Sequence, residues 1–358
     1  MTLHDLSILR FKNQQIARSK FKTVKELARW MGAIQAQDYI MSKWAFGIRI
    51  QDPTEELVNN AIDSGEIIRT HLMRPTWHFA SSDDILWILE LTASQIKASL
   101  KFRDNQLGLT EPVFRKSNRI IERSLRDSNH LTREEIISEL VKDRIDVGNN
   151  RASHLLVRAE SDGLICSGRI KGGKLTYALL SERVPANKSL SRIEALKELA
   201  SRYFTSHGPA TLQDFTWWSG LSTNDSKQAL EFARSELSSE IIENQTYWFA
   251  GSVVDTGPDD DTACLLPAYD EFVISYRDRT ASLIPPFHKK AVSDNGIFYP
   301  TIVINGKVIG TWKRTAKKDS VVITINLFDS VKQDMKPEII KASSGYVNFL
   351  GKKAEVIL

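Results

Sequence analysis

Two glutamines one residue apart, Gln35 and Gln37 in the stretch GAIQAQD, are the residues whose types and spacing suggest chemistry. Each side-chain amide offers a carbonyl oxygen as acceptor and an NH2 group as donor, with no net charge and no useful pKa. Such a pair can hold and orient a water molecule, but it is a poor general base. The pair therefore suits hydrolysis of a bond whose leaving group is already activated, such as the glycosidic bond of a purine alkylated at N7.

The two amides can act together only if the backbone between them is extended. The helix expected before the motif has a buried face with helical spacing, formed by Val24, Leu27, Met31 and Ile34. If that helix continued, Gln35 and Gln37 would point about 200° apart. If the chain is extended after Ile34, the period of two places both amides on one side and Ala36 on the other. We expect the extended conformation; the plain alternative is two surface glutamines after a helix.

The chain runs three times through the same expected order, two or three helices followed by a pair of strands. In the second copy, Thr132 and Glu135 form a capping box, and Gly172 and Gly173 mark a hairpin turn. Helix, turn, helix and hairpin is the winged-helix order. We therefore expect an α+β fold with three tandem winged-helix motifs at residues 1–107, 108–186 and 187–256, followed by a β-rich C-terminal region at residues 257–358.

The C-terminal region begins with an acidic loop at residues 255–262 and contains several alternating apolar runs. Asn305 and Gly306 between two such runs give the typical signal of a two-residue hairpin. In the third motif, Ser222 or Thr223 is expected to cap a helix. These signals predict a strand-rich tail after three helix-rich motifs.

Composition indicates an ordinary globular protein, with 358 residues, 42% apolar, 26% charged and a net charge of +4. No stretch approaches the roughly 20 apolar residues of a membrane helix. Asp5, Arg10 and Lys12 interrupt the N-terminus, which therefore lacks the apolar core of a secretory signal. Cys166 and Cys264 are far apart and argue against a disulfide framework or a zinc site. We expect a cytoplasmic protein without a metal or an organic cofactor, and a monomer because no heptad segment is present.

Winged helices commonly bind DNA, and the mildly basic balance is compatible with a polyanionic partner. Six polar residues of the first two motifs are candidates for contact with DNA: His71, Arg74, Thr76, His78, Arg151 and Arg158. The alternatives are a wing held by cross-strand pairs and a solvated helix face. Trp217 and Trp218 are expected in the core rather than stacked on bases.

Four segments, GAIQAQD, RTHLMRPTWHF, LLPAYDEFVISYRDR and IVINGKVIGTW, together resemble the bacterial tandem winged-helix DNA glycosylases of the AlkZ-like family. The resemblance implies that Gln35, Ala36 and Gln37 match a catalytic motif of glutamine, apolar residue and glutamine. A sister branch has Asp at the second polar position, whereas Asp38 here follows one place too late. The resemblance implies removal of alkylated bases from double-stranded DNA, including the unhooking of interstrand crosslinks.

Three residues of the third segment, Tyr269, Asp270 and Arg279, are expected to support the cleft. Asp270 would orient a donor or pair with Arg279; an internal structural salt bridge is the alternative. The matched motif contains no lysine, so we expect hydrolysis without Schiff-base lyase chemistry. Two other classes stay open from the residues alone, a DNA-binding transcriptional regulator without catalysis and a winged-helix scaffold for protein interactions.

Overall fold

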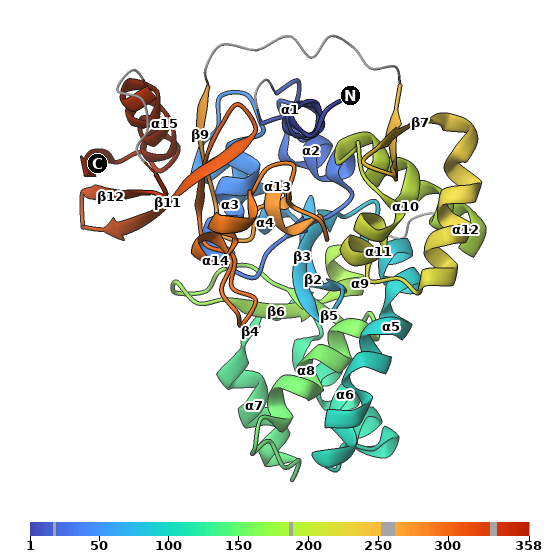
Figure 1. Cartoon of the computed structure of the whole chain (residues 1–358). Helices are drawn as coiled ribbons and strands as arrows, with labels where there is room; N and C mark the ends of the chain where they lie inside the picture. The colour runs from blue at the N-terminus through green and yellow to red at the C-terminus, as the bar shows by residue number, and fades with distance from the viewer. Residues whose placement is uncertain (17–18, 186–188, 252–261, 330–334, 358) are drawn as a thin grey trace.

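The computed structural model describes residues 1–16, 19–185, 189–251, 262–329 and 335–357. Figure 1 shows a large upper body and a smaller lobe below it, which contains α6, α7 and α8. Helix α5 runs from the upper body down to this lobe, and the C-terminal region covers one side of the upper body. The α+β class expected from the sequence is confirmed.

The first repeat follows the N-terminal helix α1 (Leu3–Asn13) and holds the glutamine motif. Its elements are α2 (Val24–Met31), β1 (Ile34–Gln35), α3 (Tyr39–Gly47), α4 (Glu55–Ser64), β2 (Ile67–Met73) and β3 (Thr76–Ser81). The strands form a sheet in the order β1-β3-β2. A capping box of Thr23 and Glu26 starts α2, and Gly32 ends it with a φ of 75°. The four residues expected on the buried face of the helix are all in the core, although Ile34 lies in β1, beyond the end of α2.

The second and third repeats follow the same order. The second contains α6 (Glu111–Leu125), β4 (Leu131–Thr132), α7 (Arg133–Lys142), α8 (Arg151–Ser161), β5 (Ile165–Ser167) and β6 (Thr176–Leu179), with α9 (Leu180–Arg183) after it. The third contains α10 (Arg192–Ser206), α11 (Leu212–Ser219), α12 (Thr223–Ala233), β7 (Leu237–Ile242) and β8 (Gln245–Ala250). The second sheet has the order β4-β6-β5, and in the third Ala210 bridges to Trp248 in place of a first strand. The predicted caps at Thr132 and Ser222 are confirmed.

Several helices in the structure, including α3, were not predicted from the sequence, and two of them are long. Helix α5 (Ile85–Gln106) joins the first and second repeats, and α15 (Lys336–Phe349) packs on the C-terminal sheet. The first half of α5 is buried from several directions, whereas its second half is mostly exposed, with Phe102 at 76%. The sequence of α5 therefore has no single apolar stripe along its length that would indicate an amphipathic helix. Even this 22-residue helix is not apolar enough to span a membrane, and no other described helix is.

The C-terminal region contains a five-stranded sheet in the order β13-β12-β11-β10-β9. Its elements are β9 (Ala263–Leu266), α13 (Glu271–Ile274), α14 (His288–Ala291), β10 (Thr301–Ile304), β11 (Lys307–Ala316), β12 (Ser320–Leu327), α15 and β13 (Lys353–Ile357). The predicted turn at Asn305 and Gly306 joins β10 to β11, with both residues at positive φ. The region is rich in strands as expected, but it also carries helices that the sequence did not indicate.

The repeats do not have separate cores. Trp44 of the first repeat packs with Trp312 and Tyr346 of the C-terminal region, and Leu72 shares a core with Trp218 of the third repeat. Only the second repeat has a core of its own among the described residues. Two of the expected boundaries, 186/187 and 256/257, and most of the acidic loop lie outside the described residues. The first repeat thus shares one core with the C-terminal region and another with the third repeat.

Candidate active site

The glutamine motif has an extended backbone at its start. Gln35 pairs with His78 across β1 and β3, and the Ala36 N–H donates to the Trp77 carbonyl at 2.8 Å. The Gln35 side chain is 3% exposed, and its Oε1 accepts from the backbone N–H of Gln37 at 2.9 Å. The Gln37 side chain is exposed, whereas Ala36 is buried. The two glutamines are therefore adjacent but differ in exposure, because Gln35 is buried and Gln37 lies at the surface.

Arg69 of β2 holds the middle of the motif. Its guanidinium donates from Nε at 3.1 Å and from Nη2 at 3.0 Å to the carbonyl oxygen of Ala36. The group lies 4.6 Å from the ring centre of Trp77, and its Nη1 is 3.5 Å from the Ser167 hydroxyl of the second repeat. Burial lowers the pKa of Arg69. The sequence analysis did not identify Arg69 as a residue that holds the motif.

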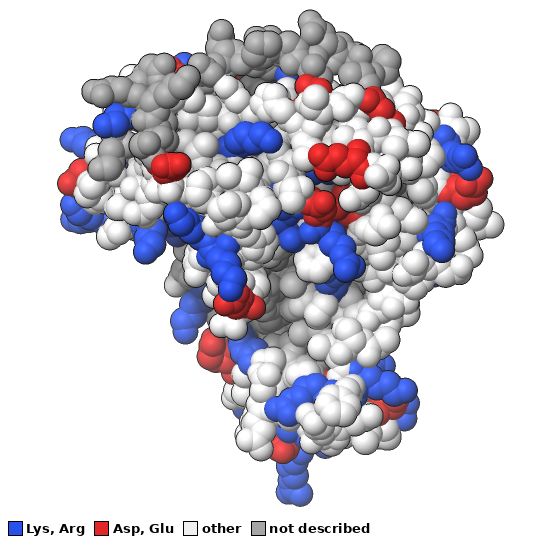
Figure 2. Space-filling view, viewed as in Figure 1, with Lys and Arg blue, Asp and Glu red and all other residues white. Residues whose placement is uncertain are grey.

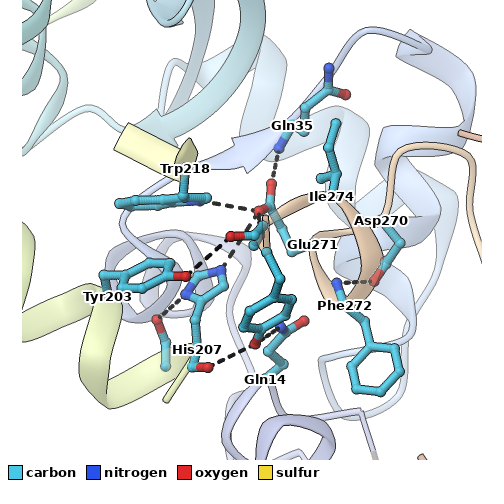
Figure 3. Close-up of polar contacts among 12 residues, drawn as sticks. Gln14, Gln35, Tyr203, His207, Trp218, Asp270, Glu271, Phe272 and Ile274 are labelled. Atoms are coloured by element: carbon cyan, nitrogen blue, oxygen red, sulfur yellow. Dashed lines mark hydrogen bonds and ion pairs between the residues drawn. The ribbon is translucent and has the colours of Figure 1, made fainter. Parts of the chain in front are cut away.

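A buried carboxylate, Glu271 at the start of α13, holds the motif from the other side (Figure 3). Its Oε1 accepts from the backbone N–H of Gln35 at 2.6 Å. Its Oε2 accepts from the Trp218 indole at 3.2 Å and from the Ser275 hydroxyl, and lies 3.6 Å from His207 Nε2. In Figure 3 the side-chain amide of Gln35 points away from this carboxylate. Glu271 therefore fixes the Gln35 backbone and leaves its amide on the side of Gln37.

The contacts of Glu271 favour the ionised form of its carboxyl. Burial alone would raise its pKa, but the contact with His207 and the charge of that imidazole outweigh burial and hold it below the usual range. Burial lowers the pKa of His207 itself. An ionised carboxylate that accepts several hydrogen bonds is the arrangement expected of a buried acid that cannot reach water.

Gln37 lines a cleft of about 990 Å³. The cleft lies between the first repeat, the hairpin of the second repeat and the C-terminal region, and its walls contain Gln37, Asp38, Tyr39, Ile40, Lys43, Asn59, Asp63, Ile170, Gly173, Leu175, Ala268, Tyr269, Ile297, Phe298, Tyr299 and Pro300. Several of its large apolar side chains are exposed, for example Ile40 at 47% and Ile297 at 43%. The volume is at the upper end for small-molecule sites, so the cleft has room for more than a single base.

Of the three residues expected to support the cleft, only Tyr269 is part of its wall. Tyr269 lines the cleft, with its ring centre 6.0 Å from that of Phe298. Asp270 is buried and pairs with Arg49 through two contacts of 2.7 and 2.8 Å. The suggested pair of Asp270 with Arg279 is wrong, and the alternative of an internal salt bridge is confirmed. Arg279 instead lies against Trp217 and Phe298.

Most of the hairpin residues that were expected to contact DNA contact other protein groups. His71 is 4% exposed and its Nδ1 is 2.5 Å from Glu160 of the second repeat, while His78 is fully buried. Both imidazoles are therefore buried among protein groups, and their contact with DNA stays a prediction. The Thr76 hydroxyl donates to the Met73 carbonyl at 3.1 Å. Arg74 is partly buried at the tip of the hairpin.

The two arginines of α8 are already engaged by protein groups. Arg151 donates from Nε to the Asp146 carbonyl at 2.8 Å and from Nη1 to the Leu107 carbonyl. Arg158 forms two contacts of 2.9 Å with Glu111 and also pairs with Asp162 at 3.0 Å. Their role in binding DNA stays a prediction. A phosphate would have to compete with these partners.

The burial of His78 makes stability depend on pH. Burial, followed by the charge of Arg74, lowers the pKa of His78 from 6.5 to about 3. The unfolded chain therefore binds a proton below pH 6.5 that the folded chain does not, and stability is lost as pH falls from 6.5 toward 3. We expect His78 to contribute a loss of about 1.5 kcal/mol between pH 6.5 and pH 5. Chemical unfolding of wild type and His78→Asn across this range measures it; equal pH slopes in the two proteins would contradict it.

Comparison with known proteins agrees with this architecture. The fold matches the solved structure of the Streptomyces sahachiroi DNA glycosylase AlkZ with a TM-score of 0.81 and 18% identity, over 100% of both chains. A protein of the same species named interstrand DNA cross-link repair glycosylase is 24% identical over 300 residues, which are 78% of this chain and 79% of that protein. The family model described as DNA glycosylase AlkZ-like matches residues 28–349. The chain belongs to this family, and the resemblance stated from the sequence is confirmed.

Proposed function

We propose that this protein hydrolyses the N-glycosidic bond of alkylated bases of the N7-alkylguanine type in double-stranded DNA. The family supports the glycosylase class, and the name of the Streptomyces relative supports interstrand crosslinks as substrates. The alternative of a regulator without catalysis is not favoured by this family. The observation that carries the proposal is the position of Gln37 on the wall of the cleft, with the Gln35 amide directly behind it.

Neutral amides are sufficient for this reaction because alkylation at N7 places a positive charge on the purine. The base then leaves without a proton, and the enzyme has to position a water molecule next to an oxocarbenium-like sugar. The Gln37 amide meets this water from the cleft. The Gln35 oxygen fixes the backbone of Gln37, so that the two glutamines position the water together. The exposed Gln37 acts by contact, and the buried Gln35 acts mainly through Gln37.

We propose that the three repeats are winged-helix motifs that hold duplex DNA. In each repeat the strands or bridge follow the same order, with the first beside the third and the third beside the second. Figure 2 shows a hollow between the upper body and the lower lobe, with Lys and Arg side chains on both sides of it. Phosphate groups supply most of the affinity in such interfaces. An open cleft suits a crosslinked base, which cannot be flipped into a closed pocket.

The direct test is an excision assay on three duplexes that carry N7-methylguanine, a bulky N7-alkylguanine or an N7 interstrand crosslink. In the presence of EDTA we expect release of the free base from the two monoadduct duplexes and loss of the covalent link between the strands of the crosslinked duplex, with an abasic strand that breaks only after heat or alkali in each case. Immediate strand cleavage would indicate lyase chemistry instead. Tight binding to the damaged duplexes without release of a base from any of them would contradict the proposal.

A further inference from the structure

Trp217 lies at the surface, although the sequence analysis expected it in the core with Trp218. Its side chain is 38% exposed, whereas Trp218 is fully buried. The Trp217 indole N–H donates to the Ile274 carbonyl at 2.8 Å, which ties α11 to the end of α13 and fixes the ring. The exposure of a large, fixed apolar ring is unfavourable unless a ligand covers it.

Two guanidinium groups lie beside this indole. The Cζ atom of Arg74 is 5.3 Å and that of Arg279 is 5.5 Å from the centre of the Trp217 ring. Arg74 has a φ of 54° at the hairpin tip and packs against Gly220, which directly follows α11 and where an added Cβ would lie 3.0 Å from the Arg74 backbone nitrogen. The Nε of Arg279 donates to the Val273 carbonyl at 2.9 Å. Both side chains are therefore held in place by neighbouring elements.

Neither guanidinium is paired with an acid in the part of the chain that the structure describes. The buried Nε of Arg74 has no hydrogen-bond partner there. Burial lowers the pKa of both groups, that of Arg279 to about 10, and the charge of Arg74 contributes to the latter shift. Asp214 is committed elsewhere, since it accepts from the backbone N–H of Asp278 and lies 3.6 Å from Arg10.

Some other buried or partly buried arginines have acidic partners, whereas Arg69 and Arg183 donate to backbone carbonyl oxygens instead. Arg49 pairs with Asp270, and Arg202 pairs with Asp84 at 2.6 Å. Two neighbouring cations without such partners repel each other and remain poorly compensated until an anion binds. Arg279 also lies 5.0 Å from the ring centre of Phe298, a residue of the cleft wall that contains Gln37. An anion bound to these groups would therefore lie next to the proposed reaction site.

We propose that Arg74 and Arg279, supported by Trp217, bind a backbone phosphate of the DNA strand beside the lesion. Planar guanidinium groups match the oxygens of a phosphodiester, and phosphate contacts set the register of a protein on DNA. This inference rests on the proposed function only in taking DNA as the ligand. It assigns to the tip of the first hairpin a positioning role for the strand.

The test is a salt titration of binding to an undamaged duplex, which needs no catalysis. For Arg74→Gln and Arg279→Gln we expect the slope of log K against log salt to become shallower by about 0.9, and Kd to rise about tenfold at ~0.1 M salt. The matched control is Arg234→Gln, because Arg234 also lies 5.8 Å from a tryptophan ring, that of Trp248, but is paired with Glu231. The control should keep the wild-type slope. Thermal unfolding of each variant, and Arg74→Lys and Arg279→Lys with the charge retained, separate loss of fold from loss of charge.

Unchanged slope and Kd in both glutamine variants would overturn the phosphate site. A second arm compares thermal stabilisation by inorganic phosphate with that by chloride at equal ionic strength. Stabilisation by phosphate that both variants lose, together with unchanged binding to DNA, would show a site for a free anion and overturn the assignment to the strand. A changed slope without excision of any base would uphold the site while the proposed function fails. Excision of a base together with an unchanged slope in both variants would uphold the proposed function and overturn the phosphate site.

Discussion

Replacement of Gln37 by alanine should slow base release by about a hundredfold or more in single-turnover assays. The Gln37 amide is the group of the motif that reaches the cleft, so its loss removes the direct contact with the attacking water. Loss of one preorganised polar group at a reacting centre commonly costs about 10²- to 10³-fold in rate. The side chain is exposed and has no role in the core, so the free energy of unfolding should stay within about 0.5 kcal/mol of wild type.

Gln35→Ala should also slow base release, but with a cost in stability. The variant removes the acceptor of the Gln37 N–H and leaves a void in a buried wall. Gln51→Ala is the matched control, because Gln51 is exposed and its side chain contacts only the Ser19 carbonyl, at 2.9 Å, among the described residues. Wild-type rates in both Gln35→Ala and Gln37→Ala, with proteins that stay folded, would refute the catalytic assignment.

The features that the sequence predicted correctly are carried by local signals. The capping box at Thr132, the cap at Ser222 and the turn at Asn305 and Gly306 depend on residues a few positions apart. The extended start of the glutamine motif follows in the same way, because Gly32 ends α2 with a positive φ. Such signals set the order of helices and strands, and hence the three repeats.

The residues that hold the glutamine motif could not be predicted in this way. Gln35 and Glu271 are 236 positions apart, and Arg49 and Asp270 are 221 positions apart. Asp270 and Glu271 come directly after Tyr269 in a segment without a recognisable motif. No local pattern there marks a carboxylate as buried. Both faces of β2 are covered, and β2 lies beside β5 of the second repeat, so Arg69 is buried. Tertiary contacts decide these positions.

The motif is thus held from separate parts of the chain. The Glu271 carboxylate holds the N–H of Gln35, β3 holds the N–H of Ala36, and Arg69 holds the carbonyl of Ala36. These contacts satisfy the backbone polar groups before the chain turns at Gln37 toward the cleft. A neutral amide has no charge to guide a water molecule, so the precision of its placement has to come from this support.

The second large effect is expected in stability, at the ion pair of Arg49 and Asp270. Both side chains are fully buried, Arg49 also donates to Gln14, and the Asp270 carboxylate caps α13 just before Glu271. Arg49→Met should lower the free energy of unfolding by about 3–5 kcal/mol, because it leaves a buried carboxylate without its counter-charge. In urea unfolding this is a large shift of the midpoint.

A second substitution, at Asp270, separates the loss of the counter-charge from the loss of packing. Asp270→Asn keeps an oxygen that can cap α13 but removes the charge, so the double variant Arg49→Met and Asp270→Asn should be more stable than Arg49→Met alone. Strictly additive losses in the two single variants would show that the ion pair contributes no coupling. If coupling is found, the variants with the largest loss of stability should also lose the most base-release activity, because α13 carries Glu271 and Glu271 holds Gln35.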